Sequence, residues 1–276
     1  MQSFFIFLAN VEYMILYFSG TGNSLAVARS IAQGVGDEIM PLVEAVRQDL
    51  TSEKRIGLVY PSYDFNTPPA VRNLVPRLKI SHEAYVFIVI PCGAQAGNSI
   101  RTVRRLLREK GVEVSYAHKI RVPDNSALVF GRNPNDQKWK FEKFAGRLER
   151  IIADVKAEKK AFHFSAWSFL GWIMGQPKME AKLLGAFRPA VREDKCIGCG
   201  TCAKICPMRN IAVNEREEAV AGQSETVAHV GPHCTACLAC VHACPKQALE
   251  VGGKPTVKER QYRHPQVKLA ELLLRK

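Results

Sequence analysis

Short runs of apolar residues alternate with helix-length segments through the first half of the chain. Five of these runs are expected strands, of which the second is the weakest: Tyr13–Phe18, Glu38–Val43, Arg55–Tyr60, Tyr85–Ile90 and Glu113–Val122. The helix-length segments between them are Ser24–Gly34, Pro68–Leu78 and Ser99–Glu109. Near-continuous apolar strands that alternate with helices are typical of a parallel sheet covered on both faces. The pattern therefore predicts an α/β fold with a doubly wound, five-stranded parallel sheet.

A polar, glycine-containing loop follows the first expected strand directly. Short hydroxyl and glycine residues at a strand-to-helix turn leave backbone N–H groups free, and the helix N-terminus completes an anion site. A dinucleotide fingerprint would need a glycine where the chain has Leu25, and the Gly-Lys-Ser/Thr ending of a Walker loop is absent. We therefore predict a phosphate site held by dipoles. Its candidate residues are Ser19, Thr21, Gly22, Asn23 and Ser24.

The loop sequence Ser-Gly-Thr-Gly-Asn-Ser resembles the phosphate loop of flavodoxins, which cradles the monoester of FMN. The resemblance covers Met14 to about Val122 and implies a flavodoxin-like domain that binds FMN. In that fold the ligand lies at the carboxyl ends of the strands, beside the switch point in strand order.

Two later loops would then flank the isoalloxazine ring, although either loop alone also suits an ordinary strand-to-helix turn. Cys92 lies in the second of them, has no histidine at a suitable spacing, and is expected to be a small residue beside the flavin, not a nucleophile. The expected contacts in the two loops are Pro61, Ser62, Tyr63, Asn66, Thr67, Cys92, Gly93, Gly97 and Asn98.

Eight of the nine cysteines form two runs of identical spacing, each ending in Cys-Pro. The runs are Cys196-x2-Cys199-x2-Cys202-x3-Cys206-Pro207 and Cys234-x2-Cys237-x2-Cys240-x3-Cys244-Pro245. This spacing resembles that of bacterial ferredoxins, in which three thiolates wrap one cubane and the fourth ligates the other. Structural zinc, with separated Cys-x2-Cys pairs and four ligands per ion, fits poorly. The runs predict two [4Fe–4S] clusters.

The crossed arrangement gives two expected ligand sets. Cys244 joins Cys196, Cys199 and Cys202, and Cys206 joins Cys234, Cys237 and Cys240. His233 and His242 adjoin these positions and are expected to lie near the clusters or at the surface without being ligands. Cysteines crowded into one segment favour metal chemistry in a reducing compartment over secreted disulfides, so we expect a cytoplasmic protein.

Composition and charge narrow the function classes. The 276 residues are 47% hydrophobic and 24% charged, which excludes a disordered chain, and the longest apolar run, Phe164–Gly175, is too short to span a bilayer. The net charge is +13, yet Glu193–Val251 holds five Lys/Arg against seven Asp/Glu. No nucleic-acid motif accompanies the basic residues. Solvated helices facing acidic redox partners are therefore favoured over a nucleic-acid or anionic-membrane surface.

These patterns divide the chain into five expected parts. Residues 1–13 are an N-terminal extension or a misassigned start, and 14–160 form the flavodoxin-like domain, which a helix over Lys138–Lys160 closes. Residues 161–192 are a helical connector, and 193–251 form a small α+β ferredoxin-like domain. Residues 252–276 are a basic tail that ends in a short helix, Val267–Leu274. For the aromatic part of the connector we expect packing over the clusters; the alternative is a membrane-surface helix.

The whole chain resembles the flavodoxin–ferredoxin fusions of anaerobic bacteria and archaea, which carry the double cluster motif late and often end in a comparable basic strap. The resemblance implies an electron carrier that links a low-potential donor to an acceptor through two clusters and FMN. The alternative is an FMN-dependent reductase of a small substrate such as a quinone, with Tyr63 and Asp64 as candidate proton donors. A redox sensor that docks through its basic surface is a third possibility.

Overall fold

The computed structural model describes residues 13–163, 168–216 and 224–273. The expected extension therefore lies outside the described residues apart from Tyr13, which opens the first strand. None of the described helices is long and apolar enough to cross a membrane.

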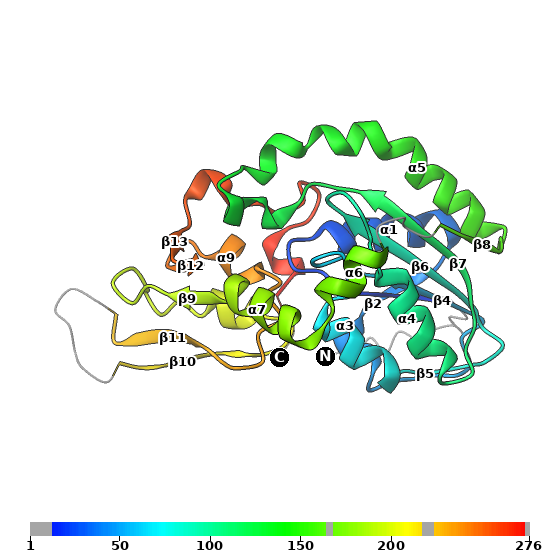
Figure 1. Ribbon diagram of the computed structural model, residues 1–276, viewed down its shortest axis with the longest axis horizontal. Helices are drawn as coiled ribbons and strands as arrows, with labels where there is room; N and C mark the ends of the chain where they lie inside the picture. Colours follow the sequence, from blue (N-terminus) through cyan, green and yellow to red (C-terminus); the bar gives the residue numbers. More distant parts are fainter. Residues whose placement is uncertain (1–12, 164–167, 217–223, 274–276) are drawn as a thin grey trace, which may run out of the picture.

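A parallel sheet forms the core of the larger domain (Figure 1). The five expected strands are present as β1 (Tyr13–Tyr17), β2 (Glu38–Pro41), β4 (Arg55–Val59), β6 (Tyr85–Cys92) and β7 (Val114–Arg121), and a two-residue strand, β8 (Ala161–Phe162), extends the edge. Every neighbouring pair is parallel, in the order β2-β1-β4-β6-β7-β8. Numbered along the chain, the first five follow 2-1-3-4-5, which is the flavodoxin-like order.

Helices cover both faces of this sheet because successive strand residues point to opposite sides. Leu16, Leu58 and Ile88 pack against α3 (Pro69–Leu74) and α4 (Ser99–Arg108). Ile15 and Val89 pack against α1 (Asn23–Val35) and α5 (Trp139–Lys156) on the other face. Shorter elements that the sequence did not reveal, α2 (Leu42–Ala45), β3 (Asp49–Leu50) and β5 (Lys79–Ile80), lie beside this core.

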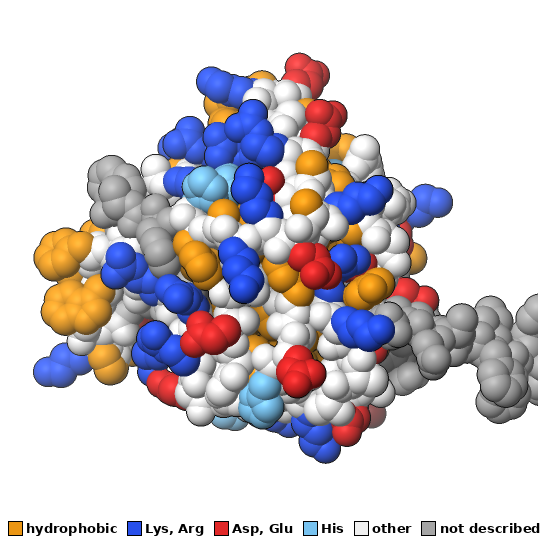
Figure 2. All heavy atoms as spheres, turned by 90° about the vertical axis from the view of Figure 1, so that its right-hand side faces the viewer, with side chains coloured by type: hydrophobic (Ala, Val, Ile, Leu, Met, Phe, Trp, Pro, Cys, Tyr) orange, Lys and Arg blue, Asp and Glu red, His pale blue; other side chains and the backbone are white. Residues whose placement is uncertain are grey.

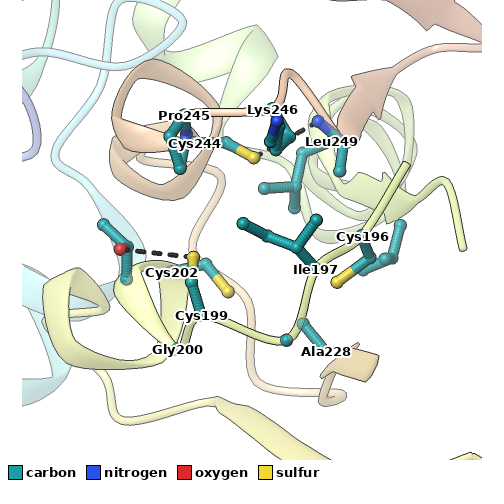
Figure 3. A pocket seen from close by; sticks show the side chains of 14 residues that line it. Cys196, Ile197, Cys199, Gly200, Cys202, Ala228, Cys244, Pro245, Lys246 and Leu249 are labelled. Carbon is teal, nitrogen blue, oxygen red and sulfur yellow. Dashed lines mark hydrogen bonds between the residues drawn. The ribbon is translucent and has the colours of Figure 1, made fainter. Parts of the chain in front are cut away.

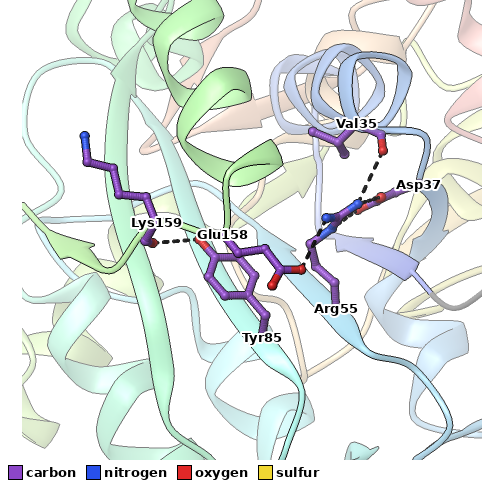
Figure 4. A network of polar contacts seen from close by, with 6 residues as sticks. All are labelled: Val35, Asp37, Arg55, Tyr85, Glu158 and Lys159. Atoms are coloured by element: carbon purple, nitrogen blue, oxygen red, sulfur yellow. Dashed lines mark hydrogen bonds and ion pairs between the residues drawn. The ribbon is translucent and has the colours of Figure 1, made fainter.

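A polar network fastens the end of the sheet where β4 and β6 begin (Figure 4). Arg55 is buried at the start of β4 and forms an ion pair with Asp37, and a weaker pair with Glu158 at 3.6 Å. Tyr85, at the start of β6, donates from its hydroxyl to the carbonyl of Lys159 at 2.8 Å. These contacts join the ends of α1 and α5 to the sheet and leave its carboxyl edge free for loops.

The smaller domain is α+β, as expected. A hairpin of β10 (Ile211–Glu215) and β11 (Thr226–Val230) and a sheet of β9 (Pro189–Val191), β12 (Leu249–Val251) and β13 (Lys254–Pro255) surround two short helices, α8 (Thr201–Ile205) and α9 (Ala239–Ala243). β9 precedes the first cysteine run and β12 follows the second, and their antiparallel pairing closes this domain. Figure 1 shows it beside the carboxyl edge of the large sheet.

The connector is helical, but its described helices line neither of the two cysteine-lined cavities of the smaller domain, which corrects the expected packing of its aromatic part over the clusters. It forms α6 (Ser168–Met174) and α7 (Pro177–Phe187), which lie between the two domains in Figure 1. Ser168 donates to the carbonyl of Gly97, and Gly171 lies against the carbonyl oxygen of Phe65. The connector thus covers the expected flavin loops, because glycine lets α6 approach their backbone closely.

The tail differs from expectation at its end. The tail is an extended strap, as predicted. A helix was expected over Val267–Leu274, but the described residues of this range form only a 3-10 turn at Leu269–Glu271. Leu274 lies outside the described residues. Arg29 of α1 pairs with Glu271 at 2.7 Å and fixes this turn against the larger domain.

Basic residues are spread over the surface at the right-hand side of Figure 1. Figure 2 shows this face, where Lys and Arg side chains lie scattered between Asp and Glu and are not gathered into one patch. Such scatter is typical of solvated helices and strand ends.

Candidate functional site

Four cysteines surround a cavity of about 380 Å³ in the smaller domain (Figure 3). Cys196, Cys199 and Cys202 come from the first run and the start of α8, and Cys244 reaches the same cavity from the end of α9. The backbone N–H of Ala248 donates to the Cys244 sulfur at 3.2 Å.

A second cavity, of about 360 Å³, has the complementary set. Cys234, Cys237 and Cys240 line it together with Cys206 from the first run. Backbone N–H groups again face sulfur: that of Asn210 donates to Cys206 at 3.3 Å, and that of Ala236 to Cys234 at 3.4 Å. Donors of this kind stabilise charge on thiolates and cluster sulfurs.

Half of the thiols in these cavities are buried, among them those of Cys202 and Cys237, and burial decides their chemistry. Burial raises the pKa of Cys202 to about 11 and that of Cys237 to about 12. Such thiols are protonated on their own, whereas a bound metal removes the proton outright. Among the described residues no group of three or more His, Cys, Asp or Glu could hold a single metal ion. Two sets of four thiols around separate cavities fit a four-iron cluster in each.

The predicted phosphate loop, residues 19–24, begins at the carboxyl end of β1 and leads into α1. Gly22 has a φ of 96°, and its N–H donates to the Ser19 hydroxyl at 3.1 Å. The loop lines a cavity of about 380 Å³ whose wall includes nine of the predicted contacts: Ser19, Thr21, Asn23, Ser24, Pro61, Ser62, Tyr63, Cys92 and Gly93.

The remaining five predicted contacts support the loops and do not line a cavity that the structure describes at this edge. Gly22 faces the strap, since a Cβ there would lie 3.1 Å from His264 and Val267. The Thr67 hydroxyl donates to the Ser99 carbonyl at 3.0 Å, and the Asn66 side chain accepts from the Thr102 hydroxyl at 3.2 Å. Gly97 and Asn98 both contact the Phe65 carbonyl.

A larger cavity of about 910 Å³ continues from the phosphate cavity. The two share wall residues from three loops: Ser62, Tyr63, Cys92, Gly93, Asp124 and Asn125. Burial raises the pKa of Cys92 to about 11, so its thiol is neutral and suits the predicted role of a small neighbour. Asp124 and Asn125 were not predicted from the sequence, although they follow β7, whose carboxyl end lies at the same edge of the sheet.

The far wall of this larger cavity comes from other parts of the chain. Leu184 and Phe187 of α7 contribute, and so do Thr235, Ala236 and Leu238 from the second cysteine run. Thr235 and Leu238 also line the cavity of Cys206, Cys234, Cys237 and Cys240. The segment 234–238 is therefore a shared wall between the cluster cavity and the large cavity of the flavodoxin-like domain.

The strap binds the two domains to the phosphate loop. Tyr262 is buried, and its hydroxyl donates to the Asn23 side chain at 2.6 Å. Its N–H donates to Nδ1 of His242, so the proton of His242 lies on Nε2, which donates to the Asn125 carbonyl at 3.0 Å. Burial lowers the pKa of His242 to about 4, and the neutral ring serves as a structural bridge and not as a cluster ligand.

Acidification should weaken the strap through the buried ring of His264, a residue whose backbone N–H donates to the Thr21 carbonyl. Burial lowers its pKa to about 4, below the value of about 6.5 in an unfolded chain. The unfolded chain binds the extra proton, so stability is full above about pH 6.5 and falls by at most about 1.4 kcal/mol per pH unit below it. The urea concentration at the midpoint of unfolding should fall less in His264→Gln than in the wild type when the pH is lowered from about 7.5 to about 5.5. Equal losses would contradict this role.

A flavodoxin-like sheet joined to a domain with two four-cysteine cavities defines an iron–sulfur protein of the electron-transfer class. Residues 195–248 match the model of the 4Fe-4S dicluster domain family. Ferredoxin-3 of Nostoc sp. is 38% identical over an alignment of 71 residues, and the match covers 22% of this chain and 72% of that protein. The chain therefore belongs to the dicluster ferredoxin family through this domain, and its metal cofactors are two [4Fe–4S] clusters.

Solved structures similar to the larger domain include two flavodoxins. Two-electron reduced flavodoxin of Megasphaera elsdenii is 24% identical, with 39% of this chain and 84% of that chain covered and a TM-score of 0.33. The flavodoxin of Streptococcus pneumoniae TIGR4 is 13% identical, with 53% and 98% covered and a TM-score of 0.37.

Proposed function

We propose that the protein carries electrons between two clusters and FMN, linking a low-potential redox protein to an acceptor. The observation that carries this proposal is the shared wall at residues 234–238, which separates the second cluster cavity from the large cavity by one loop. Each cubane exchanges one electron at a time, and FMN accepts one or two, so the combination converts between one-electron and two-electron chemistry.

FMN has a site of suitable chemistry in the larger domain. Backbone N–H groups and hydroxyls of residues 19–24 would hold its phosphate, and the larger cavity would take its ring between Tyr63, Gly93 and the cluster loop. Close backbone approach at Gly93 requires a residue without a side chain, because a Cβ there would lie 2.6 Å from Asp124. The nine cavity-lining predicted residues thus surround the proposed ligand, and the other five hold the loops.

The crossed ligand sets remain our proposal for the clusters. We call the one held by Cys206, Cys234, Cys237 and Cys240 the proximal cluster, because its loop walls the flavin site. The distal cluster, held by Cys196, Cys199, Cys202 and Cys244, lies nearer solvent: Cys199 is exposed, and Ile197 beside it is 46% exposed. We infer that partners exchange electrons at the distal cluster and that the proximal cluster connects it to FMN.

The charge balance suits acidic redox partners for the larger domain, since residues outside 193–251 carry all of the excess of Lys and Arg, while 193–251 itself holds more acidic than basic residues. Each all-cysteine cubane adds about −2 when oxidised, so the loaded smaller domain is itself acidic. We also propose the five-part division of the chain given above. We further propose that the protein is located in the cytoplasm, where thiols stay reduced.

A reductive titration tests the carrier. We expect the anaerobic holoprotein to accept about four electrons per chain, two into the clusters and two into the flavin, with both absorbances bleaching. A capacity of two electrons with an unchanged flavin spectrum would contradict the proposal.

One observation favours the alternative reductase. Desolvation of the carboxyl, followed by the charges of Asp124 and Glu180, raises the pKa of Asp64, an exposed residue that lines the large cavity and could hold a proton beside a bound substrate. Steady-state reduction of a quinone by the isolated protein, lost on Asp64→Asn but retained on Asp49→Asn at an exposed position, would favour the enzyme over the carrier.

A further inference from the structure

Within the described part of the chain, the large cavity that loop 234–238 lines is also lined by a phenol whose hydroxyl has no partner. Tyr63 Oη is buried, and the described residues offer it no hydrogen bond. The same is true of Thr235 Oγ1, which lies in the cluster loop itself. A buried hydroxyl left unpaired costs about 1–3 kcal/mol, so such groups in native proteins normally face a partner. Two of them lining one cavity indicate that a cofactor supplies the missing acceptors.

Tyr63 belongs to both domains by its packing. Its ring lies against the core of the flavodoxin-like sheet and also against the core of the smaller domain, which includes Cys237, Leu238 and Cys240. A tyrosine hydroxyl is protonated at neutral pH, so it can donate one hydrogen bond.

A strained turn fixes the position of this ring. Tyr63 and Asn66 exchange two backbone hydrogen bonds, of 2.9 and 2.7 Å, across Asp64 and Phe65. Both central residues have positive φ, 47° and 60°, although neither is glycine. Such conformations persist only where the surroundings over-determine them. Here the Asn98 N–H donates to the Phe65 carbonyl at 2.7 Å.

We propose that the Tyr63 hydroxyl donates a hydrogen bond to a sulfur atom of the proximal cluster, so that the flavodoxin-like domain sets the potential of that cluster. The inference rests on the proposed cluster ligands and deepens the proposed function. Hydrogen bonds to cluster sulfur stabilise the more negative, reduced form and raise the reduction potential. The flavin-side donor thus favours an electron on the proximal cluster, directly beside the wall of the FMN site.

The test is a redox titration of the holoprotein, followed by electron paramagnetic resonance, for wild type and Tyr63→Phe. We expect the proximal cluster of the variant to become about tenfold harder to reduce, which is about 59 mV for a one-electron couple, with the distal cluster unchanged. An exchangeable proton coupled to the proximal cluster in the wild type should be absent from the variant. Tyr85→Phe is the matched control, because its hydroxyl binds the Lys159 carbonyl at the opposite end of the sheet.

The outcomes separate this inference from the function on which it rests. Two clusters with unchanged potentials in Tyr63→Phe, or a shift of the distal cluster alone, would overturn the role of Tyr63 and leave the carrier intact. A wild-type protein that assembles only one cluster would overturn the proposed cluster arrangement itself.

Discussion

Replacement of Cys206 by alanine is expected to remove the cluster whose other three ligands lie about thirty residues further along the chain. Cys206 follows the first run, yet it lines the cavity of Cys234, Cys237 and Cys240. A cubane that loses one of four thiolates exposes iron to solvent, so we expect iron to fall from about eight to about four per chain. Iron and sulfide analysis, with the resonance spectrum of the reduced protein, measures this directly.

Two further variants make the result interpretable. Cys92→Ala should keep about eight irons, because Cys92 lies in the flavin cavities and lines neither cluster cavity. Cys199→Ala should remove the distal cluster and keep the resonance signal of the proximal cluster, which Cys206→Ala should lack. If Cys206→Ala and Cys199→Ala remove the same signal, the crossed ligation is wrong.

Gly97→Ala should abolish tight FMN binding, although Gly97, one of the predicted contacts, does not itself line either cavity. Gly97 has a φ of 55°, and a Cβ there would overlap the carbonyl oxygen of Phe65. The backbone conformation alone costs roughly 1–2 kcal/mol, and the overlap displaces the turn that holds Tyr63. We expect FMN affinity to fall at least tenfold, as measured by fluorescence titration of the flavin-free protein.

Gly36→Ala is the matched control for this substitution. Gly36 also has a positive φ, 82°, but a Cβ there would meet nothing within 4 Å. It ends α1 at the opposite end from the phosphate loop, so stability should fall slightly and FMN affinity should stay unchanged. Equal losses of affinity in both variants would show that the close contact with Phe65 is unimportant.

The sheet and the cysteine runs were predictable because their periodicities are local. Strands such as Arg55–Val59 and Tyr85–Cys92 are buried along their whole length, and continuous burial leaves a continuous apolar run. Three of the four cysteine ligands of a cubane likewise lie within one short segment, so their spacing can be recognised in the sequence. The observed ends of helices and strands differ from the expected ones by a few residues, because helix ends fray and their boundaries are the least certain part of an element.

The shared wall could not be predicted, because it depends on how the domains meet. Nothing in the sequence around Thr235 indicates that this loop lines a cavity of another domain. The turn at Asp64 and Phe65 was hidden for a local reason, since the same turn usually carries Asn-Gly. The aromatic residues of α6 suggested burial, but Phe169 and Trp172 are 69% and 59% exposed, so the expected packing over the clusters was wrong for them.

One measurement tests the central claim, that two clusters and a flavin share this chain. Iron, acid-labile sulfide and FMN should be quantified on the same anaerobically purified sample, together with its absorbance spectrum. We predict about eight irons, about eight sulfides and one FMN per chain, with structured flavin bands on a broad iron–sulfur background. Eight irons without flavin, even after FMN is added, would contradict the account and leave the flavodoxin-like domain as a docking module for a ferredoxin.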